Sequence, residues 1–156
     1  MTFSRTDLDR LSAIMAEAAG REIMPRFRSL GDGGIREKTG ALDLVTDADE
    51  QAEWLIRDQC ARAFPKALFV GEESVARDAG LLDKLQDADL AIIVDPIDGT
   101  SNFAWGLPLF GVMAAVVARG ETVAGLIYDP VGRDWRKALR GAGAWAEQHN
   151  GRTSDL

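Results

Sequence analysis

The apolar run at residues 90–94 (Leu-Ala-Ile-Ile-Val), followed at once by two aspartates, is the feature that most restricts how this chain can fold. A continuous apolar run predicts a strand that is buried on both faces, because no alternate position is left for solvent. Carboxylates at the end of a buried strand are costly unless hydrogen bonds or cations compensate for them. The run therefore predicts a strand that carries Asp95 and Asp98 to a compensated site at its end.

Helical patterns precede this run and strand patterns follow it. Apolar residues recur at helical spacing in residues 4–24, where Ser4 and Asp7 can form a capping box, and a second helix is predicted from Thr46 to Phe64. Hairpin-linked strands are predicted at 109–118, 122–128, 134–140 and 144–148. This order predicts an α+β fold, a two-layer sandwich in which N-terminal helices pack on a mainly antiparallel sheet.

Shorter elements are predicted between the second helix and its neighbours. Residues 35–38 and 42–45 predict short strands around Gly40, residues 67–71 predict a strand that leads into two glutamates, and residues 78–86 predict a short helix. The length of 156 residues suits a single domain, so we expect residues 1–156 to form one.

Composition excludes several classes of function. The formal net charge of -7, from 25 acidic and 18 basic residues, argues against a nucleic-acid partner and against an anionic membrane surface. One cysteine allows no intrachain disulfide, and Cys60 is predicted to be a core residue. One histidine, His149 in a predicted turn, argues against a histidine-based zinc site or a Ser-His-Asp triad. The first residues form no signal-peptide core, so a cytoplasmic location is expected. Four dispersed tryptophans are predicted to be packing residues: Trp54, Trp105, Trp135 and Trp145.

The segment of residues 95–100 (Asp-Pro-Ile-Asp-Gly-Thr) has the composition of a metal-binding turn. Mg²⁺ prefers oxygen ligands and is held by a few carboxylates, waters and substrate phosphates, so Asp95 and Asp98 could share ions. Gly99 permits close backbone approach, and a helix that starts near Thr100 would point amides at an anion. The alternative is an ordinary turn that is capped by Asp98 or Thr100.

Two further acidic segments allow the same two interpretations. Glu72 and Glu73 follow an apolar strand, and in extended chain they point in different directions, so one could bind metal and the other a water; a solvated turn is the alternative. Asp49 follows Thr46 by three residues, which favours a helix cap, and it could also be a hydrogen-bond partner within a site.

Together these segments resemble the inositol monophosphatase family of Mg²⁺-dependent, lithium-sensitive phosphatases. The matching stretches are residues 43–49 (Asp-Leu-Val-Thr-x-x-Asp), residues 71–74 (Gly-Glu-Glu-Ser) and residues 95–103 (Asp-Pro-Ile-Asp-Gly-Thr-Ser-Asn-Phe), in the family's order and spacing. The resemblance implies hydrolysis of a small phosphate monoester such as inositol 1-phosphate, two or three Mg²⁺ ions in the complete site, and a homodimer as an expected assembly. Within the same superfamily, histidinol phosphate, fructose 1,6-bisphosphate and 3′-phosphoadenosine phosphate remain alternative substrates.

The resemblance also implies roles for the acidic residues. Glu72, Asp95 and the Ile97 carbonyl would bind the first Mg²⁺. Asp95 and Asp98 would share the second, and Glu73 would support a metal-bound water.

The remaining implied roles concern water and phosphate. Thr100, paired with Asp49, would orient the attacking water, and the amides of Gly99 and Thr100 would receive phosphate oxygens. Lys38 matches a basic residue of the family's site.

The chain departs from the family pattern in one respect. Family members continue into a second α/β domain, which supplies a further aspartate in a Trp-Asp-x-Ala-Ala-Gly motif, and no such motif occurs here. We therefore expect a truncated chain whose second metal site lacks a ligand and whose activity alone is weak or absent. A non-catalytic metal-binding fragment is the competing hypothesis, and acids that merely cap helices and turns are the third.

Overall fold

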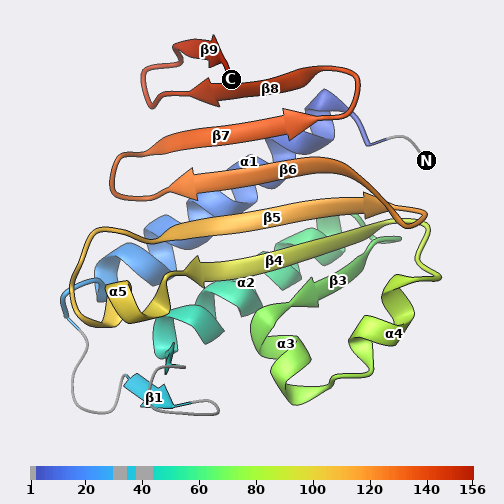
Figure 1. Ribbon diagram of the computed structural model, residues 1–156. Helices are drawn as coiled ribbons and strands as arrows, with labels where there is room; N and C mark the ends of the chain where they lie inside the picture. The colour runs from blue at the N-terminus through green and yellow to red at the C-terminus, as the bar shows by residue number, and fades with distance from the viewer. Residues whose placement is uncertain (1–2, 30–34, 38–43) are drawn as a thin grey trace.

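The computed structural model describes residues 3–29, 35–37 and 44–156 (Figure 1). Within them, seven strands form one sheet in the order β3-β4-β5-β6-β7-β8-β9. Strand β3 is parallel to β4, and every later neighbour is antiparallel. The strands are β3 (Leu68–Gly71), β4 (Ala91–Asp98), β5 (Gly111–Ala118), β6 (Glu121–Asp129), β7 (Asp134–Leu139), β8 (Gly143–Glu147) and β9 (Thr153–Asp155).

Helices α1 (Arg5–Ala18) and α2 (Asp47–Ala63) lie side by side on one face of this sheet (Figure 1). Both helices begin with a capping box, in which Ser4 and Thr46 accept a hydrogen bond from the amide three residues later. The predicted α+β class, two-layer arrangement and mainly antiparallel sheet are confirmed.

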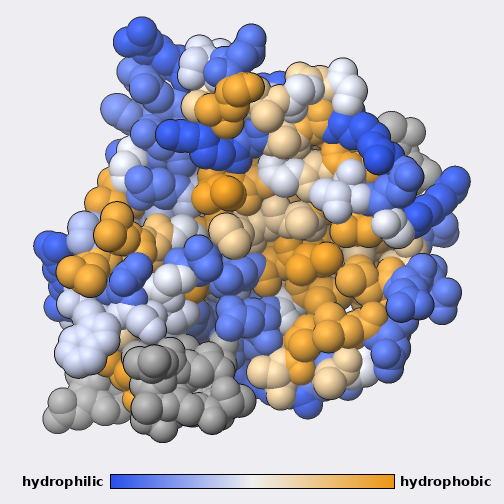
Figure 2. Space-filling model, in the orientation of Figure 1, coloured by the Kyte–Doolittle hydropathy of each residue, from blue (hydrophilic) through white to orange (hydrophobic). Residues whose placement is uncertain are grey.

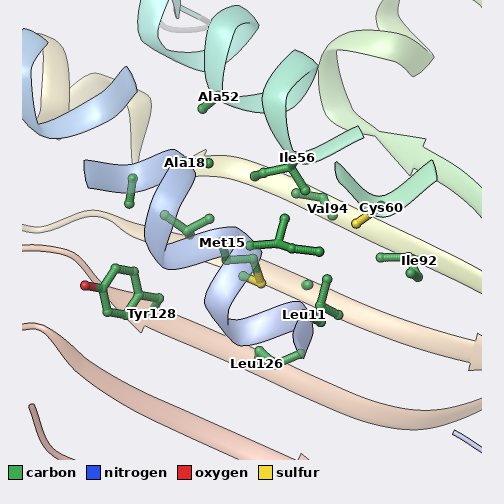
Figure 3. Close-up of a cluster of buried hydrophobic side chains, with 14 of the residues drawn as sticks. Leu11, Met15, Ala18, Ala52, Ile56, Cys60, Ile92, Val94, Leu126 and Tyr128 are labelled. Carbon is green, nitrogen blue, oxygen red and sulfur yellow. The ribbon is translucent and has the colours of Figure 1, made fainter. Parts of the chain in front are cut away.

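The core fills the space between the helices and the sheet (Figure 3). Leu11 and Met15 of α1 and Ile56 of α2 are each 0% exposed to solvent, and they pack towards Ile92 of β4 and Leu126 of β6. Cys60 is buried in the same cluster, as its helical position predicted. Ile92 and Val94 of β4 pack under the helices, whereas Ile93 is only partly buried and lines the opposite face, so the prediction of a strand buried on both faces was wrong.

The first helical segment changes its geometry before it ends. A π-helical turn (Ala19–Ile23) and a 3-10 turn (Met24–Arg26) follow α1, and the chain becomes extended at Phe27. The sequence predicted an end at Pro25, which instead lies inside the 3-10 turn. A proline is tolerated in a first turn, where its missing N–H has no intrahelical partner to lose.

Strand β4 is longer than the apolar run predicted, because Asp95 and Asp98 still pair with β5. Their partners are Met113 and Gly111, and the register shifts between them in a bulge that contains Pro96. Proline cannot donate to a ladder, so a bulge accommodates it. The two aspartates therefore lie in a bent strand end and not in a turn after the strand.

The glutamates after β3 correct one premise of the sequence interpretation. Glu72 begins helix α3 (Glu72–Arg77), so Glu72 and Glu73 are helical and not extended. Consecutive side chains of a helix still diverge, because each residue turns by about 100°. The predicted helix at 78–86 is shorter, α4 (Leu81–Leu85), and β1 (Ile35–Glu37) pairs with β2 (Leu44–Thr46) as predicted.

The face of the sheet opposite the helices is open and largely apolar (Figure 2). A hollow on it, of about 430 Å³, is lined mainly by small and apolar residues of β4–β8, with Asp95 among its lining residues. The prediction for the tryptophans was half wrong: Trp135 and Trp145 are buried, whereas Trp54 is 58% exposed and Trp105 is 80% exposed. Among the described helices, none is long and apolar enough to cross a bilayer.

Candidate active site

The parallel pairing of β3 and β4 brings the two acidic strand ends together. Gly71 is the register partner of Val94, so Glu72 and Asp95 follow at the same level of the sheet. The two strands point the same way, and α3 and α5 (Thr100–Ala104) start beside their ends (Figure 1). Glu72 and Asp95 are far apart in the sequence, and the pairing of β3 with β4 brings them together.

Asp95 is surrounded by other carboxylates. Its pKa is raised to about 8, first by burial and then by the charge of Glu72, the hydrogen bond with Glu72 and the charges of Asp98 and Asp49. The pKa of an aspartate rises in this way when its charged form lacks compensation. A cation would supply that compensation, so the surroundings of Asp95 fit a divalent metal.

Asp49 joins the same group of acids from the start of α2. Its Oδ2 accepts hydrogen bonds from the Thr46 amide at 2.9 Å and from the Thr46 hydroxyl at 2.6 Å, so the predicted helix cap is confirmed. The residue is 0% exposed, and among the described residues its Oδ1 has no hydrogen-bond partner. The pKa of Asp49 is raised to about 7, chiefly by burial and to a smaller extent by the charges of Glu73 and Glu72, while its hydrogen bonds with Thr46 act in the opposite direction.

The bulge in β4 is fixed by its own hydrogen bonds. The Ile97 amide donates to Asp95 Oδ1 at 3.1 Å, and the Thr100 hydroxyl donates to the Ile97 carbonyl at 2.9 Å. The pairing of Thr100 with Asp49 is therefore not present in the described part of the chain. A carbonyl oxygen has two lone pairs, so Ile97 retains an acceptor site for a cation.

Gly99 turns the chain from β4 into α5. Its φ is +89°, in the left-handed region, and a Cβ there would lie 2.9 Å from the carbonyl oxygen of Leu109. Asn102 holds that same carbonyl through a 2.7 Å hydrogen bond from its side-chain amide. Helix α5 begins at Thr100 as predicted, and the aromatic rings of Phe27 and Phe110 pack against Phe103 within it.

The acids are neighbours, but they do not enclose an ion as they stand. Across the described ranges, no three side chains of Asp, Glu, His or Cys are close enough together to hold a metal. The hydrogen bond between Asp95 and Glu72 indicates how the metal-free acids relieve their repulsion. The carboxylate and carbonyl oxygens are nevertheless the donor type that hard divalent cations take.

The sequence analysis missed one buried acid beside these residues. Glu53 of α2 is 4% exposed, and its carboxylate accepts hydrogen bonds from the amides of Glu73 and Ser74. The available signal was its position four residues after Asp49, on the same face of α2. Lys38 and Asp43, which the sequence also singled out, lie outside the described residues.

Comparison with known proteins gives a consistent match. The model of the inositol monophosphatase family matches residues 6–155. The chain is 35% identical over 129 residues to Nus factor SuhB of Escherichia coli K12, covering 83% of this chain and 46% of that protein. It is 34% identical over 121 residues to fructose-1,6-bisphosphatase/inositol-1-monophosphatase of Thermotoga maritima, covering 78% of this chain and 44% of that protein.

A solved structure shows the same fold. The IMPase of Thermotoga maritima superposes with a TM-score of 0.77 at 30% identity, over 90% of this chain and 51% of that one. The chain thus spans about half of that structure, and less than half of the two curated relatives above. The family model matches nearly the whole chain and the fold agrees with it, so the chain belongs to the inositol monophosphatase family.

Proposed function

We propose that this chain carries the metal- and phosphate-binding half of a divalent-cation-dependent phosphatase for small phosphate monoesters, with inositol 1-phosphate as the first substrate to test. The observation that carries the proposal is the register of β3 and β4, which sets Glu72 beside Asp95 next to the start of α5. Histidinol phosphate and other sugar or nucleotide phosphates are alternative substrates within the same chemistry.

The proposed ligands are oxygen atoms from two strand ends. Glu72, Asp95 and the Ile97 carbonyl would hold one cation, Asp95 and Asp98 a second, and Glu73 a water of the metal shell. When bound, Mg²⁺ supplies a water of lowered pKa and offsets the charge of the leaving oxygen. The raised pKa of Asp95 supports this assignment, because the cluster of acids needs a positive charge.

The protein's own groups would orient the reactants. Asp49 Oδ1 is buried and has no hydrogen-bond partner among the described residues, so it can accept a proton from a water or from the Thr100 hydroxyl once that hydroxyl leaves the Ile97 carbonyl. The amides of Gly99 and Thr100, at the left-handed turn into α5, would donate hydrogen bonds to phosphate oxygens. Most of the catalysis would then come from positioning and charge, as is usual in phosphoryl transfer.

The test measures cation binding and phosphate release on the same sample. We expect Mg²⁺ or Mn²⁺ to raise the melting temperature of this chain, because a ligand that binds only the native state stabilises it. Phosphate release from inositol 1-phosphate should be slow, because the chain spans less than half of its curated relatives, should require the cation and should be abolished by Asp95→Asn. Metal-independent release, or Asp95→Asn with near wild-type turnover, would refute the proposal.

A non-catalytic metal-binding domain is the second candidate. The finding that favours it is that the chain spans less than half of the two curated relatives, so it need not carry their complete site. Cation-induced stabilisation without phosphate release from any of the candidate substrates would select this function over hydrolysis. If the cation neither stabilises the chain nor supports phosphate release, the acids serve only to cap helices and turns.

A further inference from the structure

Helix α3 begins without a capping side chain of its own. Its N-cap residue is Gly71, and the first amides of any helix lack intrahelical acceptors. In most helices a Ser, Thr, Asp or Asn at the N-cap accepts from the second or third amide. Here those amides belong to Glu73 and Ser74, which directly follow the proposed metal ligand Glu72.

The missing acceptor comes from α2. Glu53 Oε2 accepts from the Glu73 amide at 2.6 Å, and Oε1 accepts from the Ser74 amide at 2.8 Å. The Ser74 hydroxyl also donates to Oε1. One carboxylate, 20 residues away in sequence from Glu73, therefore binds three donor groups at the start of α3.

Gly71 has the space that this arrangement needs. Its φ is −108°, a conformation open to any residue, so backbone strain does not explain the glycine. A Cβ at this position would lie 2.2 Å from Cδ of Glu53 and within 2.5 Å of both carboxylate oxygens. Any side chain at residue 71 would displace the carboxylate from the helix start.

We propose that Glu53 is a positioning residue for the metal site, and that Gly71 is small in order to admit it. The proposal rests on the function proposed above. Glu72 follows Gly71 at the level of Asp95, so the two carboxylates lie close together and repel each other whenever both are ionised. By holding the amides of Glu73 and Ser74, Glu53 keeps Glu72 beside Asp95 against that repulsion.

If stabilising the start of α3 were the only role of Glu53, a neutral N-cap side chain would be sufficient. A carboxylate with two oxygens takes both amides and the hydroxyl at once, and this fixes the rotation of the helix start as well as its position. Residues that orient ligands in this way typically change metal affinity by about 10- to 100-fold when they are replaced.

The experiment is a double-mutant cycle read out by Mn²⁺ binding in calorimetry. We expect Glu53→Gln and Gly71→Ala each to weaken Mn²⁺ binding by about 10- to 100-fold. In a Glu53→Ala background, however, Gly71→Ala should have little further effect, because the added methyl group no longer meets a carboxylate. Asp58→Asn is the matched control: this α2 acid pairs with Arg62, has no hydrogen bond to α3 among those described, and should bind Mn²⁺ like the wild type.

Amide hydrogen exchange supplies a readout that needs no metal. In Glu53→Gln, the amides of Glu73 and Ser74 should lose protection while those in the middle of α2 keep it. Circular dichroism confirms that each variant is folded, and Gly71→Ala tests the proposal with Glu53 still in place.

The outcomes separate the two proposals. If the wild type binds Mn²⁺ and the folded Glu53→Gln and Gly71→Ala variants bind it within twofold of wild type, the positioning role is wrong and the proposed function stands. If Gly71→Ala is equally harmful with and without Glu53, the steric explanation is wrong. If the wild type binds no Mn²⁺, the proposed function fails and the role of Glu53 fails with it.

Discussion

Replacing Gly99 by alanine tests whether the turn into α5 depends on both a backbone conformation and a close contact. At φ +89°, alanine costs about 1–2 kcal/mol relative to its ordinary conformations. The added Cβ also lies 2.9 Å from the Leu109 carbonyl oxygen, and forcing a group into a packed site costs about 1–3 kcal/mol more. We therefore expect Gly99→Ala to lower the free energy of unfolding by about 2–5 kcal/mol.

Gly141→Ala is the matched control for this prediction. Gly141 has a φ of +81°, but no atom lies within 4 Å of the Cβ that alanine would add. It should lose only the conformational part, about 1–2 kcal/mol. Urea unfolding of the two variants, followed by circular dichroism, gives the difference directly. Equal losses at the two positions would show that the Leu109 carbonyl moves away without cost and would refute the steric reasoning.

Three further predictions follow from the core and from the buried acids. Phe103→Ala should lower the free energy of unfolding by about 3–5 kcal/mol in urea titrations, because the ring is 0% exposed; a loss below 1 kcal/mol would contradict the packing. Cys60, whose thiol pKa burial raises to about 12, should resist alkylation at pH 8 until urea unfolds the chain; rapid native labelling would show that it is accessible. In the metal-free chain the pKa values of Asp49 and Asp95 are raised to about 7 and about 8, so their protonated forms stabilise the fold at low pH, and this contribution is lost as pH rises from about 4 through 7 to 8. Asp95→Asn should therefore have a higher melting temperature than the wild type at pH 8 but not at pH 4. A difference in melting temperature that does not change with pH would refute the assignment.

The sequence predicted those parts of the fold whose signals are local. The capping boxes at Ser4 and Thr46, the strand at residues 90–94 and the hairpins each depend on residues close together in the chain, and their presence is confirmed. The start of α5 at Thr100 is confirmed for the same reason.

Features that depend on distant partners could not be predicted in this way. In the sequence Glu53 is an ordinary helical acid, and its hydrogen bond to the Ser74 amide exists only because the fold brings the start of α3 beside α2. Strand β9 is short and polar and exists only because β8 offers an edge. The roles of individual site residues remain predictions, because they concern ions and substrates.

The parallel register of β3 and β4 also bears on the order in which the molecule folds. Strands β4 to β9 are consecutive in sequence and pair with their nearest neighbours, so little loop entropy opposes them. Strand β3 can pair with β4 only after the connection of residues 72–90 has folded back, because parallel strands need a crossover. This pairing brings Glu72 close to Asp95. We expect this step to come late and to be slowed by charge repulsion, so that divalent cations accelerate the last phase of refolding while leaving the hairpins unaffected.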